Sequence, residues 1–132
     1  YLYDMILINK GMTNSVALTL NEFKTINDPY YIFVFQNIMT KEEKTFYSEN
    51  LSVNKDSFDL FDIVENSTED LLNGVVSLDA GQWYYTAWES PIISLTSSNF
   101  ISVVETGRVL VVGTSSTPSY DGEDEIIPSY NG

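Results

Sequence analysis

The stretch DAGQWYYTAWE, residues Asp79–Glu89, decides the fold that we expect for this chain. It begins with a turn signal at Asp79-Ala80-Gly81 and continues into the densest aromatic segment of the sequence. With the strand period of two, its side chains divide between two faces: Trp83, Tyr85 and Ala87 on one, and Tyr84, Thr86 and Trp88 on the other. Aromatic and β-branched residues suit a pleated surface, so the stretch predicts a strand.

The spacing within this strand is similar to the corner of immunoglobulin-like β-sandwiches, where the pattern is Asp-x-Gly/Ala-x-Tyr-x-Cys. In that corner an aromatic ring with a polar tip tethers the arch between the two sheets. Trp83 stands at the tyrosine position and Tyr85 at the cysteine position. The pattern favours an all-β fold, and since the chain has no cysteine, we expect this fold to lack a disulfide. The expected architecture is an antiparallel immunoglobulin-like β-sandwich of about 7–9 strands with a flexible C-terminal tail.

Other strand signals recur along the chain at roughly ten-residue spacing, which is typical of a sandwich. The segments are Met5–Ile8, Ser15–Phe23, Tyr30–Phe35, Thr45–Val53, Phe58–Val64 and Val75–Leu78. Asn73-Gly74, in front of the last segment, is a hairpin signal.

The end of the domain leaves two interpretations open. Pro91–Asn99 reads as an excursion rich in serine and threonine, and Phe100–Val104 and Arg108–Val112 follow it as strand-like segments. We expect Thr106-Gly107 to turn a tight hairpin between these segments. The alternative is one long strand with a bulge at Gly107.

The composition divides the chain into a β-sandwich domain, residues 1–113, and an acidic tail containing proline, serine and tyrosine, residues 114–132. Such a tail cannot bury enough apolar surface to fold alone. Its two Pro-Ser-Tyr repeats stand ten residues apart, at Pro118 and Pro128. The tail is either a solvated segment or an arm that orders on a partner, with Tyr120, Ile127 and Tyr130 as anchors.

Charge and composition exclude several classes of function. A net charge of −13 with six basic residues argues against binding nucleic acid or anionic membranes. With no histidine and no cysteine, the usual catalytic triads and zinc sites are absent, and no phosphate-binding loop or calcium loop is present. We therefore expect no enzyme activity, no catalytic, cofactor-binding or metal-binding residues, no cofactor and no small-molecule ligand.

Three segments, Tyr30–Phe35, Trp83–Trp88 and Val109–Val112, are apolar on both faces, whereas an antiparallel sheet usually shows water one face. Either these are central strands with ordinary exposed tyrosines, or another subunit covers the outer face of one sheet. Arg108, the only arginine, is expected to form a salt bridge or an interface contact with an acid. The candidate interface residues within the domain are Tyr31, Phe33, Tyr84, Trp88 and Arg108.

Four pieces of the sequence, INKGMTNSVALTL, NDPYYIFVFQN, GQWYYTAWES and VVETGRVLV, carry a resemblance to a group of proteins. Over residues 5–113 the chain resembles small β-sandwich virion structural proteins of tailed bacteriophages, including crAss-like and other Bacteroidetes phages. The resemblance implies a non-enzymatic subunit located in the virion, such as a head decoration, fibre, collar or tail adaptor. Its implied partners are copies of itself and other virion proteins.

The alternative function is a carbohydrate- or surface-binding β-sandwich module. Such a module stacks sugars on exposed aromatic rings, and the candidates are Trp83, Trp88, Tyr84 and Tyr31. Exposed tryptophans would favour this alternative.

Overall fold

The computed structural model of this chain describes residues 5–20, 23–53 and 58–113, and within them it contains eight strands and no α-helix. The strands are β1 (Met5–Asn9), β2 (Thr13–Leu18), β3 (Tyr30–Asn37), β4 (Glu43–Tyr47), β5 (Asp59–Glu65), β6 (Val75–Val76), β7 (Gly81–Ser90) and β8 (Ser102–Val112). A short 3₁₀ turn, Ser97–Asn99, lies in the excursion between β7 and β8. The predicted tail lies outside the described residues.

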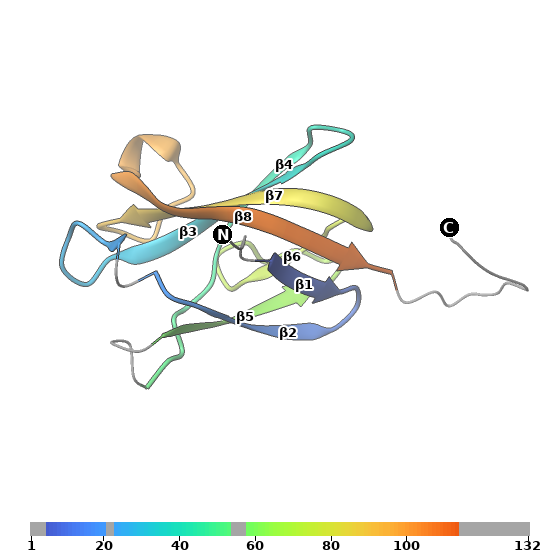
Figure 1. Ribbon diagram of the computed structural model, residues 1–132, viewed down its shortest axis with the longest axis horizontal. Helices are drawn as coiled ribbons and strands as arrows, with labels where there is room; N and C mark the ends of the chain where they lie inside the picture. Colours follow the sequence, from blue (N-terminus) through green and yellow to red (C-terminus); the bar gives the residue numbers. More distant parts are fainter. Residues whose placement is uncertain (1–4, 21–22, 54–57, 114–132) are drawn as a thin grey trace, which may run out of the picture.

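The strands form two sheets that lie one over the other, as Figure 1 shows. The five-stranded sheet has the order β1-β8-β7-β3-β4, and the three-stranded sheet has the order β2-β5-β6. Both sheets are mixed, because β1 runs parallel to β8 and β6 runs parallel to β5, while the other pairs are antiparallel. The all-β prediction is therefore confirmed and the arrangement is compatible with a β-sandwich, but neither sheet is purely antiparallel.

Aromatic side chains fill the space between the two sheets. Phe33 and Phe35 of β3 contact Phe46 of β4, and Phe33 also meets Phe61 of β5 edge to face, with ring centroids 5.0 Å apart. Such edge-to-face contacts add to the apolar area that these rings remove from water. The core thus joins β3 and β4 of one sheet to β5 of the other.

The aromatic strand has the two faces that its sequence predicts. Trp83, Tyr85 and Ala87 are fully buried in the core, whereas Tyr84 on the opposite face remains 44% exposed. The indole Nε1 of Trp83 donates a hydrogen bond to the carbonyl oxygen of Asp79, 3.0 Å away. The Trp83 side chain therefore holds the segment between β6 and β7 against the start of β7.

The expected hairpin at Thr106-Gly107 is wrong, because β8 is one strand of 11 residues. It pairs with β7 on one side and β1 on the other, and a hairpin would forgo both ladders. The bulge is also displaced from the predicted position: Ala87 pairs with Glu105 and Trp88 with Val103, which leaves the residue between them as the additional one. Gly107 stays in register opposite the buried Tyr85.

Three other strands end earlier than expected. The strand expected at Thr45–Val53 is β4, which ends at Tyr47, because the chain then leaves the sheet toward β5. β2 ends at Leu18 and does not reach Phe23, although Leu20 still points into the core. Asn73-Gly74 does form a turn, in which Gly74 has a φ of +73° and the chain closes an antiparallel bridge between Asp70 and Val75. The strand after it is only two residues long.

Candidate functional site

The side of the five-stranded sheet that faces away from the three-stranded sheet is the candidate functional surface, and we call it the outer face. Strand alternation and register place the following residues on it: Met5, Leu7 and Asn9 from β1; Val103, Thr106, Arg108, Leu110 and Val112 from β8; Gln82, Tyr84, Thr86, Trp88 and Ser90 from β7; Tyr30, Ile32, Val34 and Gln36 from β3; Glu43, Thr45 and Tyr47 from β4.

The outer face is nearly free of acids in a strongly acidic chain. The sequence has 19 acidic residues, yet among the described residues on this face the one carboxylate is Glu43, on the edge strand β4. The only arginine of the chain, Arg108, lies on β8. Protein interfaces are depleted in carboxylates and enriched in tyrosine and arginine, so this distribution favours an interface.

The exposed part of the outer face spans β1, β8 and β7. Register brings Arg108 beside Met5 and Tyr84, and Leu110 beside Leu7. Exposure of these side chains is high for apolar residues: Met5 is 60% and Leu7 54% exposed. We call this surface the Tyr84–Arg108 patch; its members are Met5, Leu7, Tyr84, Arg108, Leu110 and Val112.

Arg108 and Tyr84 form the polar centre of the patch. The guanidinium carbon of Arg108 lies 5.3 Å from the centre of the Tyr84 ring, within the range of a cation–π contact. Its Nη1 lies 3.5 Å from Oε1 of Gln82, at the limit of a hydrogen bond. A shallow hollow of about 410 Å³ opens beside this pair, between Thr86 and Thr106. The acidic contact that we expect for Arg108 stays a prediction.

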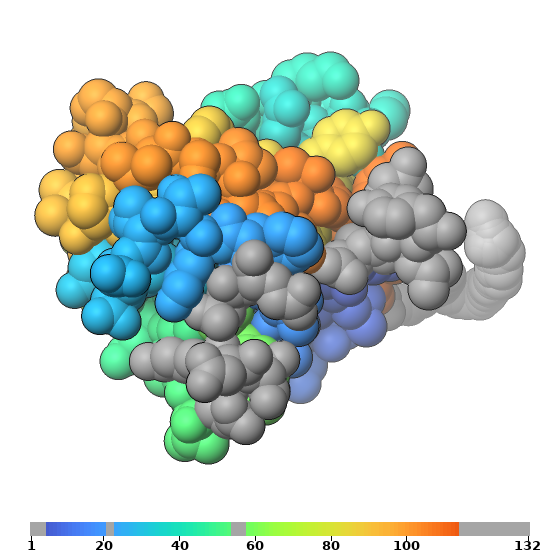
Figure 2. All heavy atoms as spheres, turned by 60° about the vertical axis from the view of Figure 1, so that its left-hand side comes forward, coloured from blue at the N-terminus to red at the C-terminus, as the bar shows by residue number. Residues whose placement is uncertain are grey.

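The chain itself covers the other end of the outer face. Ile32 lies on this face but is fully buried, between Tyr47 and Trp88 in the register. The Trp88 ring packs against Phe100 of the excursion, with centroids 5.7 Å apart. Figure 2 shows the excursion, in light orange, projecting from the body beside β8. The opposite end of the outer face, with Met5, Leu7 and Tyr84, remains exposed.

Of the predicted interface residues, Tyr84, Trp88 and Arg108 do lie on the outer face. Tyr31 and Phe33 do not: they are 4% and 0% exposed and point toward the three-stranded sheet, because odd-numbered residues of β3 face the core. The predicted anchors Tyr120, Ile127 and Tyr130 lie outside the described residues.

The structure also tests the aromatic platforms of the alternative function. Trp83 is buried in the core and cannot stack on a sugar, and Trp88 is half-buried against Phe100.

Sequence reasoning missed Met5, Leu7 and Leu110 as surface residues. The alternation Met5-x-Leu7 in a short apolar run was the available signal, but only the register of β1 beside β8 shows that these residues meet.

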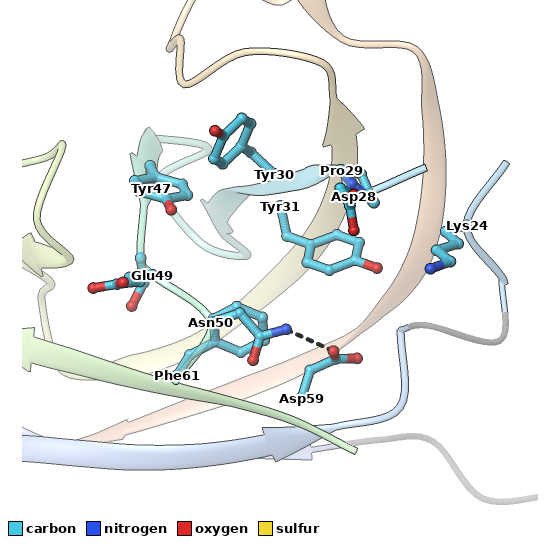
Figure 3. A pocket seen from close by; sticks show the side chains of 11 residues that line it. Lys24, Asp28, Pro29, Tyr30, Tyr31, Tyr47, Glu49, Asn50, Asp59 and Phe61 are labelled. Atoms are coloured by element: carbon cyan, nitrogen blue, oxygen red, sulfur yellow. Dashed lines mark hydrogen bonds between the residues drawn. The ribbon is translucent and has the colours of Figure 1, made fainter. Parts of the chain in front are cut away.

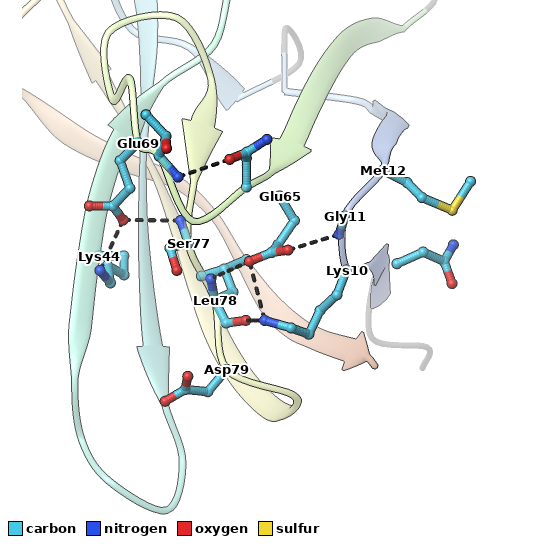
Figure 4. Close-up of polar contacts among 12 residues, drawn as sticks. Lys10, Gly11, Met12, Lys44, Glu65, Glu69, Ser77, Leu78 and Asp79 are labelled. Carbon is cyan, nitrogen blue, oxygen red and sulfur yellow. Dashed lines mark hydrogen bonds and ion pairs between the residues drawn. The ribbon is translucent and has the colours of Figure 1, made fainter. Parts of the chain in front are cut away.

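Two buried carboxylates outside this face have structural partners. Glu65 accepts hydrogen bonds from the backbone N–H groups of Gly11 (2.8 Å) and Leu78 (3.0 Å) and from the Lys10 ammonium (3.3 Å), as Figure 4 shows. Burial alone would raise the pKa of Glu65, but these donors outweigh it and lower the pKa below its ordinary value. Glu65 therefore fastens the β1–β2 turn to the segment after β6.

Glu89, fully buried at the end of β7, fastens the loop before β3 in the same way. Its carboxylate accepts hydrogen bonds from the backbone N–H groups of Thr25 (2.8 Å) and Ile26 (3.3 Å) and from the hydroxyl groups of Thr25 and Ser102. Burial raises the pKa of Glu89, the Ser102 and Thr25 donors lower it, and the net shift is downward. Both carboxylates are satisfied by donors of the chain, so they hold loops in place.

The described residues contain no cluster of three or more Asp, Glu, His or Cys side chains that could hold a metal ion. Within the same ranges, no helix is long and apolar enough to cross a membrane. Comparison of the chain with protein-family models, curated proteins and solved structures finds no match.

Proposed function

We propose that this chain is a non-enzymatic structural subunit that acts through contacts with copies of itself and with neighbouring proteins, and that the Tyr84–Arg108 patch is its contact surface. The observation that carries the proposal is the outer face, where acids are nearly absent from an acidic chain and apolar side chains remain exposed. The resemblance of its sequence segments to virion proteins of tailed bacteriophages supports placing this subunit in a phage virion.

An immunoglobulin-like topology is part of the proposal. The order β4-β3-β7-β8 corresponds to the C′-C-F-G order of immunoglobulin variable domains, and the pair β2-β5 corresponds to their B-E pair. The hydrogen bond from Trp83 to Asp79 occupies the position of the tyrosine corner. Both observations support the finer classification, in which one sheet offers a broad face for assembly.

Self-association through the patch is compatible with the charge of the chain. Exposed charges more than about 8 Å apart are largely screened at physiological salt. Burying about 1,600 Å² of total surface, with Tyr84 and the apolar side chains at its centre, can outweigh the remaining repulsion. Association is therefore expected to strengthen as salt rises, the reverse of a contact held by ion pairs.

Replacing Tyr84 with glutamate tests the proposal. Because the substitution places a desolvated carboxylate at the centre of the patch, Tyr84→Glu is expected to convert the oligomer to monomer while the folded chain persists. Sedimentation velocity measures the oligomeric state and circular dichroism measures the fold.

Ala17→Glu is the matched control, because Ala17 is exposed on the three-stranded sheet and the added charge is the same. It is expected to leave the oligomer intact. A wild-type monomer at high protein concentration and high salt would refute self-association, and equal effects of the two variants would refute the assignment of the patch.

The tail provides a separate prediction from the sequence. Deleting residues 114–132 is expected to leave the thermal melt of the domain unchanged and to weaken assembly, because the tail lacks the apolar surface for folding but carries anchors for a partner. Differential scanning calorimetry and sedimentation of the truncated chain measure the two effects. A truncated chain that unfolds would show that the tail belongs to the sandwich.

A further inference from the structure

A polar groove lies at the open side of the molecule, between the end of β4 in one sheet and β5 in the other (Figure 3). Its volume is about 460 Å³, within the range of roughly 300–1,000 Å³ that small-molecule sites occupy. Its walls come from the loop before β3, the start of β3, the segment after β4, and β5. Its polar lining includes Lys24, Asp28, Tyr31, Glu49 and Asp59.

The Tyr31 hydroxyl group is the unexplained feature of this groove. The side chain is 4% exposed and its ring packs edge to face on Phe61, with centroids 6.2 Å apart. Figure 3 shows the hydroxyl pointing into the groove, and among the described residues it has no hydrogen-bond partner. Burial, together with the carboxylates of Asp59 and Glu89, raises the pKa of Tyr31, so the hydroxyl is a neutral donor.

A buried hydroxyl group without a hydrogen-bond partner lowers the stability of the fold. A phenylalanine at this position would fill the same space and avoid that cost. Two polar side chains of the wall already have partners: Asn50 Nδ2 donates to Asp59 Oδ1 (2.7 Å), and Asp59 Oδ2 accepts from the backbone N–H of Leu20 (2.8 Å). These bonds fix the side chains of Asn50 and Asp59 in the wall of the groove. The hydroxyl is therefore presented to whatever enters the groove.

The chemistry of the lining selects the class of ligand. Carboxylates of Asp28 and Glu49 supply acceptors, and the Lys24 ammonium and the Tyr31 hydroxyl supply donors. Vicinal hydroxyl groups, which each donate and accept, match this mixture. A phosphate would be repelled by the carboxylates, and a bare metal ion would lack a cluster of three ligands among the described residues.

We propose that this groove binds a saccharide unit, with the Tyr31 hydroxyl donating to a sugar oxygen. The site is distinct from the Tyr84–Arg108 patch, so the inference goes beyond assembly and gives the subunit a ligand. It departs from the sequence-based expectation of no small-molecule ligand, because the groove is assembled from separate segments that no local motif reveals.

Nuclear magnetic resonance titration of the full chain tests the proposal. The probes are glucose, galactose, mannose and N-acetylglucosamine, each added to millimolar concentration. At least one is expected to cause saturable shifts of amide signals at Tyr31, Glu49 and Asn50. Shifts that map to other surfaces, or no shifts with any probe, would overturn the proposal.

Tyr31→Phe provides the decisive variant, because it removes only the hydroxyl. It is expected to weaken saccharide binding about fivefold, the value of one hydrogen bond, and to leave the melting temperature unchanged or higher. Tyr85→Phe is the matched control: its hydroxyl donates to Glu105 Oε1 (2.9 Å) in the core, so this variant should melt lower and bind the sugar equally well.

Unchanged sugar affinity in Tyr31→Phe would refute the role of the hydroxyl. Sedimentation of the same variant separates this outcome from the proposed assembly, since the groove shares no residue with the Tyr84–Arg108 patch. Loss of the oligomer in Tyr31→Phe would instead show that the groove is a protein contact and would overturn the saccharide assignment.

Discussion

Replacing Trp83 with alanine is expected to lower the free energy of unfolding of this chain by about 3–5 kcal/mol, the usual cost of deleting a buried aromatic side chain. Trp83 is fully buried and is among the largest side chains in the core. The substitution leaves a cavity between the sheets and removes the hydrogen bond from Nε1 to the carbonyl oxygen of Asp79. Because domains of this size are stable by about 5–15 kcal/mol, the variant should be close to unfolding.

Trp88→Ala is the matched comparison for this measurement. It deletes the same side chain from the same strand, but from the outer face, where Trp88 is half-buried against Phe100. Denaturant melts of a monomeric form should show a clearly smaller loss than for Trp83→Ala. A loss of less than about 1 kcal/mol for Trp83→Ala would show that the ring is not part of the core.

The strand around Trp83 and its two faces were predictable from the sequence because every signal for them is local. The turn residues, the period-two alternation and the spacing to Asp79 all lie within one stretch of the chain. β5 was also predicted as a strand, and its burial alternates: Phe61 and Ile63 are buried, whereas Leu60, Asp62 and Val64 are half-buried. Strict alternation reports which face of a strand is buried.

The orientation of β3 was not predictable in this way. Its apolar run gives no alternation to read, so the sequence alone does not show that Tyr31 and Phe33 point into the core and not toward an interface. The continuity of β8 depends on its pairing with β7 and β1, which lie far away in the sequence, and these ladders override the local turn preference of Thr106-Gly107. Tertiary pairing decides such cases.

The two candidate sites also differ in how far local sequence reveals them. Tyr84 and Arg108 could be named from the sequence, because an aromatic strand and a lone arginine are visible there, but their contact and their acid-free surroundings follow from register. The groove could not be found, because Lys24, Tyr31 and Asp59 come together only when β3 and β5 lie in opposing sheets.

Truncating Glu89 to alanine is expected to lower the free energy of unfolding by about 2–4 kcal/mol at neutral pH. The carboxylate accepts four hydrogen bonds, and its loss leaves the backbone N–H groups of Thr25 and Ile26 without an acceptor. These hydrogen bonds are part-buried, and a donor left unsatisfied away from water costs about 1–3 kcal/mol. Glu69→Ala is the control: Glu69 also accepts from a backbone N–H, of Ser77, and from Lys44, but it is exposed, so less than about 1 kcal/mol should be lost.

The same carboxylate predicts how stability depends on pH. The pKa of Glu89 is lower in the folded chain than its ordinary value of 4.5, so its contribution is complete above pH 4.5 and is lost as the pH falls through the folded value. Wild-type stability should therefore fall below about pH 4.5, and Glu89→Gln, which cannot ionise, should fall less steeply there. Urea melts between neutral and acidic pH measure both slopes. Equal slopes for the two proteins would contradict the assignment, since Glu89 would then bind its proton equally well in the folded and unfolded chain.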